Sequence, residues 1–382
     1  MEQLKIHIIH TILASITMSL YACQSPTNTT PINTWEEGEY IPAHRTLELL
    51  DTERNRALNV EIWYPSAESS SRGESVEYFE TDPEYKESLI QLLEEAPSEC
   101  TTLQTNAIRN APPAVLSEPL PLIVFSHCMN CGRYSSFSLA ERLASHGMIV
   151  LAADHAGPVP FHPSSEGEYL SSEQLETRAK DIQKLIDAAL DAQLFDDAPE
   201  LKELSIDPNK IGAFGHSFGS VSVGKAAQED NRILAVAGLG APMDNPLFPN
   251  VDIQNLSIPI FFILAQEDNS IGELGNDLLR DNYESANPPV WLAELQDAGH
   301  WSVSDLCGLT EQFQPGCGDG ERHSKENEGE SFSYASVSWG INTTQRYLTT
   351  FFVATLNDDE RAQELLNDLP PIEGSQVTSR LE

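Results

Sequence analysis

Positive charge is scarce in this sequence. Of its 382 residues, 22 are lysine or arginine and 59 are aspartate or glutamate, which gives a formal net charge of −37. Nucleic acids and anionic membrane surfaces attract proteins through basic patches, so we expect neither as a binding partner. Acidic stretches such as Glu326 to Glu330 most simply keep the surface solvated. Hydrophobic residues make up 40% of the chain, which is enough to bury a substantial core.

The amino terminus lacks an apolar run long enough to span a membrane. The stretch from about Ile8 to Leu20 is interrupted and shorter than the about 20 residues of a spanning helix. With Lys5 ahead of it, the stretch is typical of an export signal. Leu20 to Cys23 resembles a bacterial lipobox, in which the cysteine is lipidated and becomes the first mature residue.

These patterns predict how the chain begins. We expect a lipoprotein-type signal peptide over residues 1–22, lipidation at Cys23 and a flexible tether over residues 23–41. Gln24 favours the bacterial outer membrane or cell surface, by resemblance to the usual sorting pattern. The alternatives are a general secretory signal, which would leave the protein periplasmic or secreted, and a disordered leader. We expect contact with the membrane only through the lipid anchor at the amino terminus.

Cysteine is also rare, with six in the chain. Two pairs are close in sequence, Cys128 with Cys131 and Cys307 with Cys317. Their spacing is irregular and no matched histidine pattern accompanies them, so a zinc site is disfavoured and we expect neither a metal nor a cofactor. In an exported protein each pair is predicted to form a local disulfide, with Cys100 free or paired elsewhere.

The most informative motif is the five-residue segment from Gly215 to Gly219, which has the pattern G-x-S-x-G around Ser217. It follows the short apolar run Ile211 to Phe214 and precedes a helix-compatible stretch, Ser220 to Gln228. Strand, sharp turn and helix in this order are the context of a nucleophile elbow, where the serine is exposed in a strained conformation. The pattern alone occurs often by chance, so its context must carry the argument.

That context lies downstream. The buried strand Ile258 to Leu264 is followed by Asp268, and the next strand, Val290 to Leu295, is followed by His300. Open α/β sheets build their sites at the carboxyl ends of their strands, and the order nucleophile, acid, histidine is that of the α/β-hydrolases. We therefore predict a catalytic triad of Ser217, Asp268 and His300.

Chemistry explains these residue types. Serine is a poor nucleophile at neutral pH, so a histidine must take its proton and pass it to the leaving group, a role we assign to His300. A carboxylate must accept the other ring N–H and stabilise the imidazolium. Asp268 is the first candidate for that carboxylate, and Glu267 is the alternative. We expect structural roles for the other histidines near the strand and helix ends: His127, His146, His155 and His216.

Apolar periodicity predicts an α/β fold. Buried strands alternate with amphipathic helices, which implies a mostly parallel twisted sheet with helices on both faces. The helices expected are Ser135 to His146, a stripe from Leu175 to Leu190, and Tyr334 to Leu356. We predict one domain over residues 42–357, followed by an acidic tail over residues 358–382. Ser66 to Val115 and Leu306 to Ser331 are excursions that cap or rim the site.

Several motifs together resemble one family. They are Arg45 to Asp51, Arg54 to Arg56, Val60 to Pro65, Phe125-Ser126-His127, Leu143 to Gly147 and Gly215 to Gly219. In combination they are similar to the plasma-type platelet-activating-factor acetylhydrolases and the related bacterial predicted dienelactone hydrolases, within the α/β-hydrolase superfamily. The resemblance covers about residues 42–357 and implies an α/β-hydrolase fold.

The oxyanion hole is the next element of such a site. One donor should be the backbone N–H of Phe218, the residue after the nucleophile. The second normally comes from the loop after the third strand, here the loop that follows Leu122 to Phe125. The resemblance assigns it to the N–H of Met129, and Cys128 stands where the family has glycine.

The function implied is that of a secreted, lipid-anchored serine carboxylic ester hydrolase acting through an acyl-enzyme. By resemblance, its substrates are short or oxidised acyl esters of phospholipid-like or other small molecules. A polyester hydrolase, a dienelactone-type hydrolase and an acyltransferase are alternatives on the same fold. A non-catalytic surface-binding lipoprotein is the alternative from another class, because a fold does not determine a function.

Overall fold

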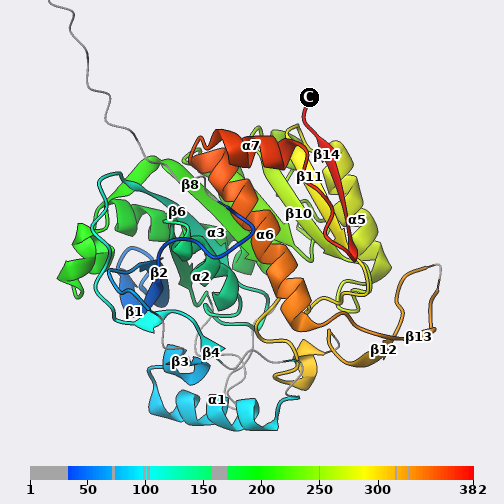
Figure 1. The fold of residues 1–382 in the computed structure, drawn as a ribbon, viewed down its shortest axis with the longest axis horizontal. Coiled ribbons are helices and arrows are strands. Elements are labelled where there is room, and N and C mark those ends of the chain that lie inside the picture. The colour runs from blue at the N-terminus through cyan, green and yellow to red at the C-terminus, as the bar shows by residue number, and fades with distance from the viewer. Residues whose placement is uncertain are drawn as a thin grey trace, which may run out of the picture. The chain divides into compact units, whose positions relative to one another are not determined.

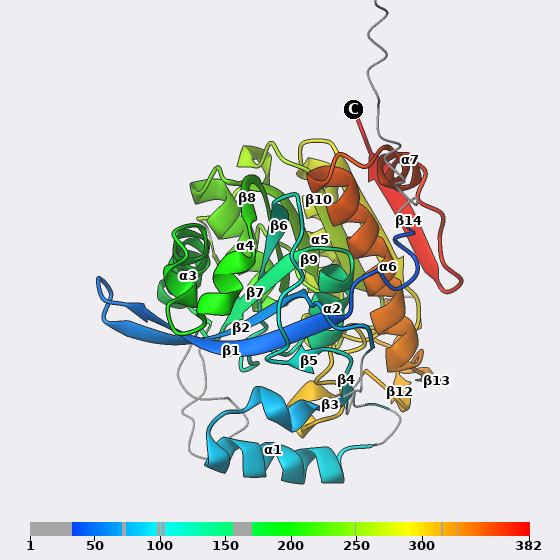
Figure 2. The ribbon, with the colours of Figure 1, turned by 60° about the vertical axis from the view of Figure 1, so that its left-hand side comes forward.

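A ten-stranded sheet runs through the fold, with helices packed against both of its faces (Figures 1 and 2). In this computed structural model the residues described are 33–70, 74–97, 100, 104–155, 170–248, 250–314, 316–325 and 327–382. The expected signal peptide and the lipidation site Cys23 lie outside them.

The strands follow the order β14-β11-β10-β9-β8-β6-β7-β2-β1-β5. Six neighbouring strands in this order are parallel to one another, namely β11, β10, β9, β8, β6 and β7. Strands β2 and β14 join this block antiparallel at its two sides. The strand bounds are β1 Pro42–Asp51, β2 Arg56–Pro65, β5 Ile108–Arg109, β6 Leu120–Ser126, β7 Ile149–Ala153, β8 Ile206–His216, β9 Ile233–Leu239, β10 Ile260–Ala265, β11 Val290–Leu295 and β14 Ser375–Arg380.

The helices form one layer on each face of the sheet. Side chains of α2, α6 and α7 pack into one hydrophobic cluster, and side chains of α3, α4 and α5 pack into the other. Parallel strands covered on both faces read as continuous apolar runs, and β10 is buried at every position. The predicted α/β-hydrolase fold class is confirmed. The helix bounds are α2 Phe137–Ser145, α3 Ser172–Leu190, α4 Phe218–Glu229, α5 Gly272–Ser285, α6 Val337–Leu356 and α7 Glu360–Asn367.

The carboxyl-terminal segment is part of this fold, so the predicted acidic tail over residues 358–382 is wrong. Helix α7 packs Ala362 and Leu366 into the core, and β14 extends the sheet by pairing antiparallel with β11. The excess of acidic residues suggested a solvated segment. However, apolar residues spaced along α7 and the unpaired edge of β11 provide enough contacts to order it.

The described part of the predicted tether is also packed. Thr34 is buried, and its hydroxyl lies 2.6 Å from that of Thr350 on α6. Trp35 rests against the core, and the guanidinium of Arg346 lies over its ring. Residues 33–41 therefore contribute to the domain, and the prediction of a flexible tether is wrong for this stretch.

The two excursions carry small elements of their own. The first holds β3 Glu74–Ser75, the 3₁₀ helix Val76–Phe79, α1 Pro83–Glu95 and β4 Gln104–Thr105, and the second holds a hairpin of β12 Asp319–Glu321 and β13 Ser331–Ser333. The side chain of Glu141 on α2 anchors the first by accepting hydrogen bonds from the backbone N–H groups of Asn106 and Ala107, at 3.0 and 3.3 Å.

A disulfide between Cys100 and Cys317 joins the two excursions. The predicted pairing of Cys307 with Cys317 is therefore wrong, although the structure does pair Cys128 with Cys131. Cys307 is fully buried, and burial raises the pKa of its thiol to about 12. Proximity in sequence suggested a local bridge, but the fold carries Cys100 across 217 positions of sequence to reach Cys317.

Candidate active site

Ser217 occupies the turn between β8 and α4. Its backbone has φ 56° and ψ −121°, a conformation that costs energy for any residue with a side chain. The turn is held where its N–H donates to the carbonyl of Leu239, at 2.8 Å. Such strain persists only where the surrounding structure imposes it, and it is characteristic of functional positions.

Glycines on both sides of the turn allow the close approach that imposes this strain. A Cβ at Gly215 would collide with the backbone of Gly219, and a Cβ at Gly219 would collide with the carbonyl of Ser126. The first glycine therefore lets strand and helix meet, and the second lets the helix start against the end of β6. This is the geometry expected of the motif.

His300 is oriented by a carboxylate. Its Nδ1 lies 2.6 Å from Oδ2 of Asp268, and both side chains are buried. The other carboxylate oxygen accepts the backbone N–H groups of Ser270 and Ile271, each at 2.9 Å. Because an ionised carboxylate only accepts hydrogen bonds, Nδ1 must carry the proton, and Nε2 is left as the acceptor of the ring.

Two aromatic neighbours hold this histidine in place. The ring of His216 donates from Nε2 to the carbonyl of His300 at 3.0 Å, and the ring of Trp301 meets that of His300 edge-on at 4.8 Å. Burial lowers the pKa of His216 well below its usual value, and a proton on both nitrogens of His300 would lower it further. His216 is therefore a neutral support, the structural role expected for it.

Glu267, the alternative acid, points elsewhere. It accepts hydrogen bonds from the guanidinium of Arg322 at 2.9 Å, from the N–H of His323 at 2.6 Å, and from both the N–H and the hydroxyl of Ser324. Burial would raise the pKa of this carboxyl, but these hydrogen bonds bring it below its ordinary value. Glu267 thus anchors the second excursion, and Asp268 alone of the two meets His300.

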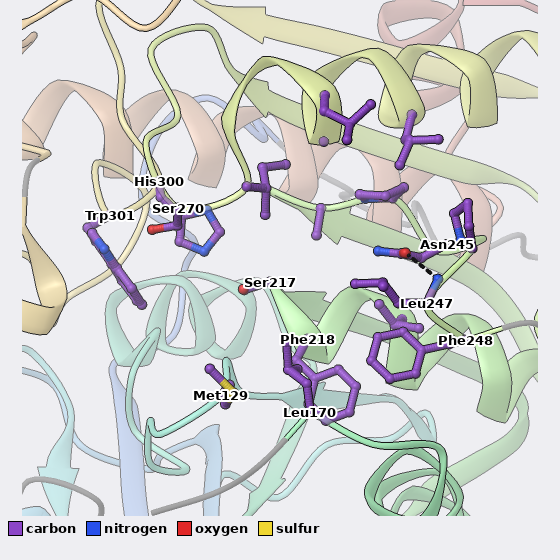
Figure 3. A pocket seen from close by; sticks show the side chains of 18 of the residues that line it. Met129, Leu170, Ser217, Phe218, Asn245, Leu247, Phe248, Ser270, His300 and Trp301 are labelled. Carbon is purple, nitrogen blue, oxygen red and sulfur yellow. Dashed lines mark hydrogen bonds between the residues drawn. The ribbon is translucent and has the colours of Figure 1, made fainter.

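Ser217 and His300 line the same cavity, whose volume is about 690 Å³. In Figure 3, His300 and Trp301 lie on one side of Ser217, and Leu247 and Phe248 lie on the other. Among the described residues that line it, none is lysine, arginine, aspartate or glutamate. The lining is mostly apolar and consists of Met129, Leu170, Ser217, Phe218, Val221, Ala241, Pro242, Asn245, Pro246, Leu247, Phe248, Ser270, Ile271, Leu274, Gly275, Leu278, His300, Trp301 and Gln312.

The two proposed oxyanion donors flank the serine. Phe218 is the first residue of α4, so its N–H belongs to the free amide groups at a helix start. Met129 lines the cavity and lies in the turn that the Cys128–Cys131 disulfide closes. The backbone N–H of Cys131 donates to the carbonyl of Cys128 at 3.3 Å, and Asn130 takes the positive φ of 55° that the turn requires.

A second Ser–His–Asp series lies beneath this loop. The hydroxyl of Ser126 is 3.0 Å from Nε2 of His155, whose Nδ1 is 3.0 Å from Oδ2 of Asp181. All three side chains are buried, and none lines the cavity. Sequence patterns assigned His155 a structural role but missed its partners, and they also missed Trp301 and the leucines of the cavity. Of these residues, only Trp301 could have been predicted from the sequence, because it directly follows His300.

No helix within the described ranges has the length and apolar character needed to cross a membrane. Among the same residues, no group of three or more histidine, cysteine, aspartate or glutamate side chains is placed to hold a metal ion.

Comparisons with known proteins agree on the type of fold. The model of the dienelactone hydrolase family matches residues 111–304, and that of platelet-activating factor acetylhydrolase, isoform II, matches residues 45–159. A ferulic acid esterase from Streptomyces cinnamoneus superposes with a TM-score of 0.63 at 24% identity, over 92% of this chain and 98% of that one.

Curated relatives match a shorter stretch. The platelet-activating factor acetylhydrolase of Canis lupus familiaris is 29% identical over 191 residues, which is 40% of this chain and 42% of the relative. That of Bos taurus is 31% identical over 185 residues, 39% of this chain and 40% of the relative. The chain thus spans about two fifths of the length of the relatives that it matches.

Proposed function

This chain belongs to the dienelactone hydrolase family, and on that premise we propose that it is a serine carboxylic ester hydrolase working through an acyl-enzyme. The observation that carries the proposal is the setting of His300. Asp268 holds its Nδ1, and the ring lines the same cavity as Ser217. A base with one nitrogen held and the other available, beside a strained serine, is the arrangement that nucleophilic catalysis needs.

The reaction has two halves. In the first, Oγ of Ser217 attacks the ester carbonyl carbon while Nε2 of His300 takes the hydroxyl proton. The tetrahedral intermediate then collapses, the C–O bond to the alcohol breaks, and His300 returns the proton to the departing oxygen. In the second, water deprotonated by His300 attacks the acyl-enzyme, and the acid leaves as Ser217 regains its proton. No cofactor is needed.

Charge develops at two places during each half. The imidazolium is stabilised by Asp268, whose charge acts strongly because both side chains are buried. The negative oxygen is stabilised by the N–H groups of Phe218 and Met129, which need no reorganisation because each sits on fixed backbone. Donors of this kind contribute roughly a hundred- to a thousand-fold in turnover each.

The cavity supports short or oxidised acyl esters of phospholipid-like or other small molecules as substrates. Its volume lies within the range of about 300–1,000 Å³ typical of small-molecule sites, and its walls are apolar. Relatives named platelet-activating factor acetylhydrolase favour the same class. A substrate bearing a carboxylate would find no cationic side chain among the described lining residues, which argues against a dienelactone-type substrate.

Labelling with a serine-directed phosphonate tests the proposal. We expect one equivalent of label on the peptide that contains Ser217 and none on the Ser217→Ala variant. Turnover of 4-nitrophenyl esters graded by acyl length should then favour uncharged short chains. Absence of label from folded protein, or label on another residue, would refute the mechanism and support a binding protein instead.

We also propose that the protein is exported and anchored through lipidated Cys23. The two disulfides support an oxidising compartment, since such bonds are rare in the reducing cytosol. Cys23→Ala should move the protein from the membrane fraction to the soluble fraction without changing turnover per folded molecule. An unacylated mature amino terminus at another residue, measured by mass spectrometry, would reject the anchor.

A further inference from the structure

A fully buried arginine on α3 grips the loop that holds Met129. The guanidinium of Arg178 donates from one nitrogen to the carbonyl of His127 and from the other to the carbonyl of Cys128, the latter at 3.2 Å. The planar guanidinium holds its donors in a fixed fork that engages two successive carbonyls in one geometry, whereas the donors of a lysine sit on a single nitrogen at the end of a flexible stem. Two adjacent peptide groups of the loop are thereby fixed.

The carbonyl of Cys128 has further donors. It accepts the Nδ1–H of His127 at 2.7 Å and the N–H of Cys131 at 3.3 Å. Nε2 of His127 accepts the backbone N–H of His155 at 3.2 Å, which requires the proton to be on Nδ1. Burial, with the nearby charge of Arg178, lowers the pKa of His127 well below its usual value and keeps this tautomer neutral.

The orientation of one carbonyl determines that of the next N–H. In a trans peptide the C=O of Cys128 and the N–H of Met129 point in opposite directions. Because the carbonyl of Cys128 points toward the buried side chains of Arg178 and His127, the N–H of Met129 points away from those side chains. Met129 lies on the cavity side of the loop, below Ser217 in Figure 3.

The same arginine also contacts the other proposed donor residue. The Cζ atom of Arg178 lies 4.7 Å from the centre of the Phe218 ring, within the range of cation–π attraction. Gly219, the next residue, abuts the carbonyls of Ser126 and His127. Arg178 therefore touches the loop on one side and the first residue of α4 on the other.

We propose that Arg178 is a positioning residue that aligns the two halves of the oxyanion hole, by holding the Cys128–Met129 peptide in one orientation against Phe218. This inference rests on the proposed function. Without the arginine, the Cys128–Met129 peptide can rotate and present its carbonyl instead of its N–H to the developing negative charge. Arg178 touches no substrate, so its effect is confined to the transition state and leaves ground-state binding unchanged.

The test compares binding of the transition state with binding of the ground state. Arg178→Met retains bulk and removes the donors, and Arg178→Lys retains charge without the fork. We expect Arg178→Met to lower kcat about a hundred-fold or more with little change in KM, the signature of a lost oxyanion donor. The affinity for an alkyl trifluoromethyl ketone, which forms a tetrahedral adduct on Ser217, should fall by the same factor. The affinity for the corresponding ether, which forms no adduct, should not change.

Arg142 supplies a matched control. It is a nearly buried arginine on α2 that pairs with Glu37 at 2.8 Å and donates to the carbonyl of Thr34. Arg142→Met should lower the melting temperature while leaving kcat and the ketone-to-ether affinity ratio unchanged. If Arg178→Met is not recovered folded, the ketone-to-ether affinity ratio of Arg178→Lys tests the positioning role instead.

The outcomes separate this inference from the proposed function. A normal kcat and a normal ketone-to-ether ratio in a folded Arg178 variant, with Ser217→Ala inactive, would overturn the positioning role alone. Equal losses of ketone and ether affinity would also overturn it, because they would indicate general damage to the cavity. Turnover that persists in Ser217→Ala would overturn the proposed function itself.

Discussion

The molecule contains two Ser–His–Asp series, and they differ in their access to a ligand. In both, Nδ1 of the histidine meets an aspartate, at 2.6 Å for His300 and at 3.0 Å for His155. Ser217 is partly exposed, strained and open to the cavity, whereas Ser126 is buried at the end of β6. The two series share residue types and a histidine–aspartate contact, and they differ in backbone geometry and in access to a cavity. Those two differences are the reason why we propose Ser217, and not Ser126, as the nucleophile.

The carboxylates of the two series also have different neighbours. Among the described residues, the carboxylate of Asp268 has His300 and the backbone N–H groups of Ser270 and Ile271 as hydrogen-bond partners, whereas Asp181 pairs with Arg54 at 2.7 Å and Arg56 at 3.1 Å. Burial would raise the pKa of Asp181, but its bond to His155 and the two arginines lower it. Asp181 thereby joins the β1–β2 hairpin to α3, which is a structural task.

The largest expected difference is between the two serines. Ser217→Ala should lower kcat/KM for 4-nitrophenyl acetate on the order of a million-fold, because members of a triad act as a unit. Ser126→Ala should change it little and cost about 1–3 kcal/mol of stability, since it leaves Nε2 of His155 without this partner. If folded Ser217→Ala retained more than a tenth of the parent's rate, the proposed difference in catalytic role between Ser217 and Ser126 would be wrong.

The two neighbouring acids after β10 should differ next. Asp268→Asn should lower kcat on the order of ten-thousand-fold, because an amide can hold His300 in the wrong tautomer. Glu267→Gln is the matched control. It should leave kcat nearly unchanged and instead weaken the anchoring of Arg322 and Ser324, seen as faster proteolysis of the second excursion. The reverse ranking of the two kcat values would transfer the acid role to Glu267.

The smallest effect on turnover is expected at Asp181. Asp181→Asn should lower the free energy of unfolding by about 3 kcal/mol, at the lower end for a broken buried pair because Arg54 and Arg56 remain partly exposed. The pKa of Asp181 is lower in the folded state than in the unfolded state, where it is about 4. The stabilisation that the Asp181 carboxylate provides is therefore complete at pH values above about 4 and is lost as the pH falls through the folded-state pKa. Urea unfolding of the variant and the parent at pH 7 and pH 3 should therefore differ most at pH 7. A loss of kcat as large as that of Asp268→Asn would mean that the second series is catalytic.

Sequence patterns predicted much of the fold and of the site because both depend on local rules. Apolar periodicity located strands β6, β8, β10 and β11 and helices α2, α3 and α6, and the G-x-S-x-G motif located the strained turn. Two predictions were wrong because the actual partner lies far away in the chain, namely the local Cys307–Cys317 disulfide and the acidic tail. Cys100 and β14 find their partners only after the chain has folded.

By itself, then, the sequence determined the strand order along the chain, the serine at its elbow and the order of acid and histidine behind it. These follow from side-chain periodicity and from glycines where backbones must meet. Only the tertiary structure decided which carboxylate faces His300, which Ser–His–Asp series opens on a cavity, and that Arg178 grips the loop of Met129. These contacts join residues that are far apart in the chain. The directions in which the side chains and peptide planes point are fixed only when the sheet brings its strand ends together.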